Sequence, residues 1–133
     1  MRSPEAMSRE QRRELAADVA SPAQARTIVR RMLHGGEPER ACEVAELLTS
    51  ELVTNAVRHA ASEIMLRVAV DDSTLRVEVT DTSATMPRIR DDPGVGGYGL
   101  RIVDELATRW GVESLPKRGK TVWFELDVTT RAG

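Results

Sequence analysis

Hydrophobic positions in the first half of the chain recur at the spacing of a helix. They return every three to four residues, which is typical of a helix that buries one face. We expect two helices, over Ala23–Leu33 and Pro38–His59, because His34-Gly35-Gly36 between them is a strong helix terminator. Ahead of the first helix, Ser21-Pro22 fits a helix start and Leu15–Val19 is a candidate strand.

In the second half the hydrophobic positions mostly alternate, as they do in half-buried strands. The segment from Asp81 to Gly99 has no period, contains two prolines and is rich in glycine, which predicts a long loop. A helical period returns after it for about ten residues. The expected elements are strands over 64–70, 75–80, 112–115 and 122–128, and a helix from about Leu100 that ends at Trp110-Gly111.

The order of these elements predicts the fold class. Strand, helix, helix, strand, strand, long loop, helix, strand and strand is typical of an α+β two-layer sandwich. We expect the helices on one face of a mixed, mostly antiparallel sheet. Residues 1–12 read as a flexible charged leader and residues 13–133 as a single domain. At this length we expect any regulatory partners to be separate chains.

The amino-acid composition excludes several classes of function. The chain carries 19 basic and 21 acidic residues, a formal net charge of −2, so it has no general basic field for nucleic acid. Aromatic residues are only 3% of the chain, which excludes a base-stacking platform of several rings; Trp110 and Phe124 are expected in the core. The lone Cys42 excludes an intrachain disulfide and a thiolate metal cage. Neither a membrane span nor a secretory signal is apparent, so we expect a cytoplasmic protein.

Candidate chemistry begins on the longer predicted helix. Glu51, Asn55 and His59 stand at i, i+4 and i+8 and therefore share one face. A carboxylate beside a carboxamide oxygen suits hydrated Mg²⁺ and can orient a hydroxyl or a water. The alternative is a solvated helix face whose terminal histidine is favoured by the helix dipole.

Two further segments carry candidate chemistry. Asp81 follows a strand of alternating valines, where its carboxylate could accept a hydrogen bond from a purine amine or simply form a turn. The stretch Pro93–Leu100 places four glycines before a helix, which suits a phosphate cradle, although a flexible linker has the same composition. Neither a Walker loop nor a dinucleotide-binding fingerprint is present.

Taken in order, these segments resemble the Bergerat-fold ATPases, the superfamily that includes gyrase B, MutL and the histidine kinases. The resemblance runs from about residue 15 to residue 126. Within the superfamily the chain is most similar to the bacterial anti-sigma-factor serine kinases and their ATP-binding relatives. Three stretches carry this closer resemblance: SELVTNAVRHA (50–60), GYGLRIVDELATRWGV (97–112) and GKTVWFEL (119–126).

The resemblance implies a role for each matching residue. Glu51 would be the general base for the incoming hydroxyl, Asn55 would ligate Mg²⁺ at the phosphates, and Asp81 would read the adenine amine. The other residues implied to contact ATP or to form its lid are Arg58, His59, Gly94, Gly96, Gly97, Tyr98, Gly99, Leu100 and Thr121.

Two positions depart from what the resemblance implies. The family has a glycine two residues after the adenine-reading aspartate, where this chain has Ser83. Serine narrows the room for the base, which bears on ATP affinity and turnover. On a regular strand, Thr121 would point away from the side of Val122 and Phe124, so a nucleotide contact there needs an irregular strand.

The resemblance implies an ATP-binding anti-sigma factor with serine kinase activity. Such a protein would sequester a sigma factor and phosphorylate an anti-sigma-factor antagonist, with ATP and Mg²⁺ as cofactors. It would act as a homodimer, without direct contact with nucleic acid or membrane. The alternatives are a non-catalytic binding module that uses ATP to select its partner, or a catalytic subunit for a separate histidine-kinase partner.

Overall fold

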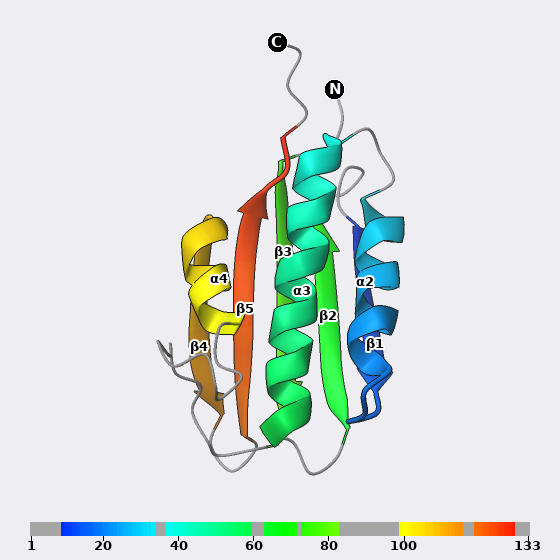
Figure 1. Ribbon diagram of the computed structural model, residues 1–133, viewed down its shortest axis with the longest axis vertical. Coiled ribbons are helices and arrows are strands. Elements are labelled where there is room, and N and C mark those ends of the chain that lie inside the picture. Colours follow the sequence, from blue (N-terminus) through cyan, green and yellow to red (C-terminus); the bar gives the residue numbers. More distant parts are fainter. Residues whose placement is uncertain are drawn as a thin grey trace.

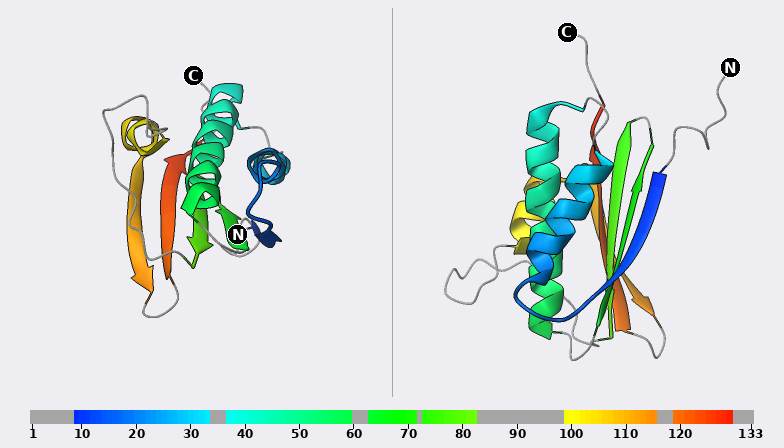
Figure 2. Two further views of the ribbon diagram at one scale, coloured as in Figure 1. Left: turned by 60° about the horizontal axis from the view of Figure 1, so that its bottom comes forward. Right: turned by 90° about the vertical axis from the view of Figure 1, so that its right-hand side faces the viewer.

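The molecule has two layers, helices on one side and a sheet on the other (Figures 1 and 2). The computed structural model describes residues 9–33, 37–59, 63–71, 73–82, 99–115 and 119–129. Figure 2 shows the helices together on one face of the sheet, as expected for an α+β sandwich. The elements are β1 (Arg9–Leu15), α2 (Ser21–Met32), α3 (Glu39–His59), β2 (Ile64–Val70), β3 (Thr74–Asp81), α4 (Gly99–Leu106), β4 (Arg109–Leu115) and β5 (Gly119–Asp127).

The sheet has the strand order β1-β2-β3-β5-β4. All its neighbouring strands are antiparallel. The sequence predicted a mixed, mostly antiparallel sheet, and the described part of the sheet is antiparallel throughout. Val77 of β3 stands opposite Val68 of β2 and Phe124 of β5. All three side chains are buried without measurable exposure, so the core runs across the inner face of the central strands.

Helix α3 covers the centre of the sheet (Figure 1), and its described length matches the predicted 38–59 segment closely. Ala45, Leu48 and Val53 are completely buried, and the small alanine lets the helix lie close to its neighbours. Leu47, expected in the buried stripe, is 39% exposed, because it lies on the side of the helix that turns away from the sheet.

The first strand lies earlier in the chain than the sequence pattern predicted. Residues 9–12 belong to β1 and pair with β2, so they are not part of a leader; residues 1–8 lie outside the described residues. The candidate strand Leu15–Val19 is wrong beyond Leu15, and Val19 is exposed. The periodicity is missing because only Leu15 of β1 is buried. Backbone pairing and the ion pair between Glu10 and Arg67 hold this edge strand instead.

The start of α2 also differs in detail from the expected cap. The helix begins at Ser21 itself, and the Ser21 hydroxyl donates to the carbonyl oxygen of Ala16 rather than capping the helix. Pro22 lies in the first turn, as its missing N–H favours.

The segment after α4 corrects a second expectation. The helix ends at Leu106, and Trp110-Gly111 lie inside β4 rather than at a helix end. Gly111 stands opposite Trp123, and a Cβ added to it would lie 2.9 Å from the indole ring. The glycine therefore makes room for the ring of Trp123 on the neighbouring strand. The local sequence pattern alone cannot distinguish such a glycine from one that ends a helix.

The two expected core aromatics have different environments. Phe124 is completely buried, as predicted. Trp110 is only partly buried, and its indole N–H donates to Asp104 Oδ1 at 2.8 Å. Among the described helices, none is long and apolar enough to cross a membrane.

Candidate functional site

The C-terminal end of α3, the end of β3 and the start of β5 lie at one end of the sandwich (Figure 1). Along its length α3 contacts β3, β5 and α4. Strand β3 ends there at Asp81 and β5 begins there at Gly119, so that Asp81 and Lys120 stand opposite each other (Figure 1). The topology thus brings the helix face with Glu51 and Asn55 to the same end of the molecule as Asp81.

Glu51 and Asn55 lie one helical turn apart on α3 and are both partly buried. Burial raises the pKa of Glu51 above its usual 4.5, and the positive charge of Arg58 opposes this only in part. A carboxylate whose pKa is raised toward neutral pH is a better proton acceptor than an exposed one. The pair is therefore suited to hold a cation and to take up a proton.

The raised pKa of Glu51 leads to a prediction about stability. Ionised Glu51 costs more free energy in the folded state than in the unfolded state, so its contribution to stability falls as pH rises through the folded pKa. Glu51→Gln cannot ionise and should be more stable than the parent protein at pH 7, by up to about 1 kcal/mol. The difference should be smaller at pH 4, because Glu51 is then more protonated in both the folded and the unfolded state. Urea unfolding at the two pH values measures it, and a less stable variant at pH 7 would contradict the prediction.

The other predicted residues of α3 lie near its end. Arg58 is exposed and acts on Glu51 through its charge. His59 is the last residue of the helix, and its side chain lies outside the described residues.

Asp81 is buried at the end of β3 and forms an ion pair with Lys120. Its Oδ1 lies 3.1 Å from the Lys120 Nζ, and each side chain is only 1% exposed. Lysine and aspartate are almost never fully buried unless they are paired. The site thus contains a carboxylate and an ammonium side by side on the inner face of the sheet, the face that the helices cover (Figure 2).

Lys120 was not among the sequence-based candidates. It lies in phase with Val122, Phe124 and Leu126, which are all buried on the inner face of β5. A lysine at a buried position of an alternating strand is the signal that could have identified it.

Gly119 sets how closely β5 approaches β3. Its φ is +101°, a conformation that favours glycine, and a Cβ at this position would lie 1.9 Å from the carbonyl oxygen of Asp81. Only a residue without a side chain allows the two backbones to come together in this way. The tight approach brings Lys120 against Asp81.

Thr121 is not brought to this site by the structure. Its hydroxyl is hydrogen-bonded to that of Thr80 at 2.7 Å, on the face of the sheet opposite to Asp81. Strand β5 is regular here, so the irregularity that a nucleotide contact would need is not seen between Gly119 and Asp127. A nucleotide contact of Thr121 finds no support in this arrangement.

The glycine-rich segment falls largely outside the described residues. Gly94, Gly96, Gly97 and Tyr98 lie outside them, as does Ser83. Gly99 begins α4, and Leu100 is buried in the core at 3% exposure. The side chain of Leu100 therefore packs the helix against the molecule, while its first-turn backbone N–H is the group that could face an anion.

A metal ion bound at Asn55 would be shared with the phosphates of a nucleotide. The described residues hold no group of three or more histidine, cysteine, aspartate or glutamate side chains that could bind one. Mg²⁺ commonly keeps several waters and takes one or two protein ligands together with substrate phosphates. The Asn55 carboxamide on a partly buried helix face fits that pattern.

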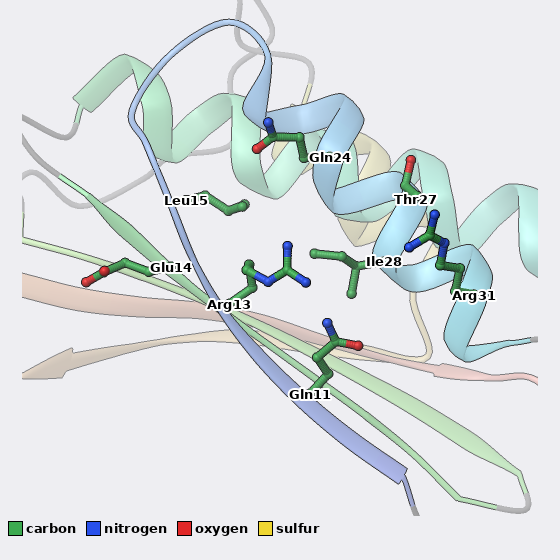
Figure 3. A pocket seen from close by; sticks show the side chains of 8 residues that line it. All are labelled: Gln11, Arg13, Glu14, Leu15, Gln24, Thr27, Ile28 and Arg31. Atoms are coloured by element: carbon green, nitrogen blue, oxygen red, sulfur yellow. The ribbon is translucent and has the colours of Figure 1, made fainter.

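A separate hollow of about 320 Å³ lies between β1 and α2 (Figure 3). It is lined by Gln11, Arg13, Glu14, Leu15, Gln24, Thr27, Ile28 and Arg31. None of the predicted site residues lines it, so it is distinct from the Glu51–Asp81 end of the molecule.

Comparison with known proteins identifies a family for this chain. A family model described as "Histidine kinase-, DNA gyrase B-, and HSP90-like ATPase" matches residues 43–130. Blue-light-activated histidine kinase 2 of Erythrobacter litoralis is 40% identical over 81 residues, covering 56% of this chain and 23% of the kinase.

Among solved structures, the RsbU and RsbW domains of Rv1364c from Mycobacterium tuberculosis share the fold. The TM-score is 0.69 at 19% identity, over 89% of this chain and 32% of that one. The chain thus spans about a quarter of the length of the kinase and a third of the solved chain.

Proposed function

The chain belongs to the histidine kinase-, DNA gyrase B- and HSP90-like ATPase family, and we propose that it is an ATP-dependent protein serine kinase and anti-sigma factor. It would sequester a sigma factor and phosphorylate a serine of an antagonist protein, in the cytoplasm and as a homodimer. The proposal is supported by the position of Glu51 and Asn55 in the C-terminal half of α3, at the same end of the fold as the buried Asp81 that ends β3 (Figure 1).

Each residue of this site would have a separate role in phosphoryl transfer. Asn55 would hold Mg²⁺, which would neutralise phosphate charge, and Asp81 would bind the base of ATP. Glu51 would accept the proton of the attacking serine hydroxyl. The serine oxygen then bonds to the γ-phosphorus, the bond from that phosphorus to the β–γ bridging oxygen breaks, and ADP leaves. Such catalysis rests on positioning and charge neutralisation.

The raised pKa of Glu51 favours a hydroxyl as the acceptor. A serine hydroxyl must lose its proton during transfer, and a desolvated carboxylate is suited to take it. The second candidate is a catalytic subunit that phosphorylates a histidine of a partner protein. It is favoured by the 40% identity with a histidine kinase over 81 residues.

The test begins with proteins captured by the purified chain from its native cell extract, with and without ATP. Captured proteins are then incubated with the chain, Mg²⁺ and γ-labelled ATP. Serine kinase activity yields an acid-stable phosphoserine on a partner, and capture of a sigma factor supports the anti-sigma role. Acid-labile phosphohistidine would favour the second candidate. If calorimetry detects ATP binding but no phosphate is transferred to any captured protein, the kinase proposal is overturned and the chain is a non-catalytic binding module.

A further inference from the structure

The ion pair of Asp81 and Lys120 places a donor beside the carboxylate that would bind the base. The two side chains are cross-strand neighbours on the inner face of the sheet, 3.1 Å apart between Nζ and Oδ1. Both are 1% exposed, so the pair is almost as buried as the apolar core. Replacing a buried ion pair by packed apolar residues is often neutral or stabilising, so stability alone does not account for it.

The chemistry of the pair matches one edge of adenine. An ammonium has three N–H donors, and one of them serves Asp81, so Lys120 has further donor capacity. A carboxylate has about four lone-pair sites on its two oxygens and can accept more than one hydrogen bond. Adenine carries a donor, the N6 amino group, directly beside an acceptor, N1. The pair thus offers an acceptor and a donor side by side to an edge that needs both.

We propose that Lys120 is a specificity-determining residue of the nucleotide site, donating to adenine N1 while Asp81 accepts from the N6 amino group. This inference rests on the proposed ATP-binding function and identifies the residues that would select adenine over other bases. Gly119 fixes the position of the donor, because its close approach to the Asp81 backbone sets where β5 begins. The Lys120 ammonium is paired with Asp81, the residue proposed to bind the base, so it would lie at the base end of the site.

Base analogues test the inference on the unaltered protein. In 1-deaza-ATP a C–H group replaces N1, so the acceptor is lost while the amino group stays. Purine riboside triphosphate keeps N1 and lacks the amino group. By calorimetry with Mg²⁺, 1-deaza-ATP should bind the protein about tenfold or more weakly than ATP, the usual loss for a hydrogen bond to a charged group. Purine riboside triphosphate should also bind more weakly.

Variants assign the lost contact to Lys120. In Lys120→Met the ammonium is removed and an apolar stem is kept, so ATP should bind about tenfold more weakly, and ATP and 1-deaza-ATP should bind equally. Arg109→Met is the matched control. It removes a cation from the neighbouring strand that pairs with Glu125 and is 69% exposed, and it should keep the parent's preference for ATP. If Lys120→Met fails to fold, the double variant Asp81→Asn with Lys120→Met removes both charges and should likewise not distinguish ATP from 1-deaza-ATP.

The outcomes separate this inference from the function on which it rests. Failure of the parent protein to bind ATP would overturn both. Equal binding of ATP and 1-deaza-ATP by the parent would overturn the role of Lys120 and leave ATP binding intact. Tighter binding of ATP by Lys120→Met would show that the lysine occupies the base site rather than reading the base, which also overturns the inference.

Discussion

Gly119→Ala is expected to lower the free energy of unfolding by at least about 3 kcal/mol. Two costs add. Alanine rarely adopts the observed φ of +101°, and its Cβ would lie 1.9 Å from the carbonyl oxygen of Asp81, a distance at which the two backbones must separate. Since small domains are stable by only about 5 to 15 kcal/mol, the loss is a large part of the total. Urea unfolding followed by circular dichroism measures it.

Gly111→Ala provides the matched control for Gly119→Ala. A Cβ at Gly111 would also make a close contact, 2.9 Å, but with the ring of Trp123 rather than with backbone. A side chain can move where a carbonyl group in a paired strand cannot, so the control should lose about 1 kcal/mol. Because separation of β5 from β3 also moves Lys120 away from Asp81, Gly119→Ala should bind ATP more weakly than the control does. A Gly119→Ala protein as stable as Gly111→Ala would contradict the close approach of the two strands.

Glu51→Gln is expected to reduce phosphoryl transfer by about 10²- to 10⁴-fold, the usual contribution of a general base. Glutamine keeps the shape of the side chain and a hydrogen-bonding oxygen, so ATP should still bind within a few-fold of the parent affinity. The measurement is single-turnover transfer of labelled phosphate to the captured partner, with binding followed separately by calorimetry. Glu43→Gln, which removes an exposed carboxylate from the same helix, should transfer phosphate at the parent rate.

The pH dependence of transfer gives a second readout of the same residue. Transfer needs Glu51 unprotonated, so the rate should fall on the acid side at a pH above 4.5, the usual pKa of glutamate, because burial raises the pKa of this side chain. The acid limb should be missing from the residual activity of Glu51→Gln. Full activity of the variant at neutral pH would contradict the base role and leave the site with a positioning function.

The helices and the central hairpin could be predicted because their information is local. The 3.6-residue period of α3 and the alternation of β2 and β3 are visible within each segment, since each buries one face against the same core. The same locality placed Glu51 and Asn55 together, because two residues four apart on a helix always share a face. The side of Thr121 also followed from alternation, since β5 is regular.

The edges of the sheet required more than local pattern. Strand β1 is largely polar and exposed, so its assignment depends on pairing with β2, a segment about fifty to sixty residues away in the chain. In β4, Gly111 has the appearance of a helix terminator and instead accommodates a ring from the neighbouring strand. Both cases depend on partners that are distant in sequence.

The sequence by itself determined the layer architecture, the helix face of Glu51 and Asn55, and the strand end that bears Asp81. Only the tertiary structure decided that Lys120 lies against Asp81 and that Gly119 must be glycine. The physical reason is register: which residue of β5 stands opposite Asp81 depends on the pairing of two strands that have α4 and β4 between them in the chain. Spacing along the chain therefore identified the carboxylate, and pairing across the sheet identified the cation beside it.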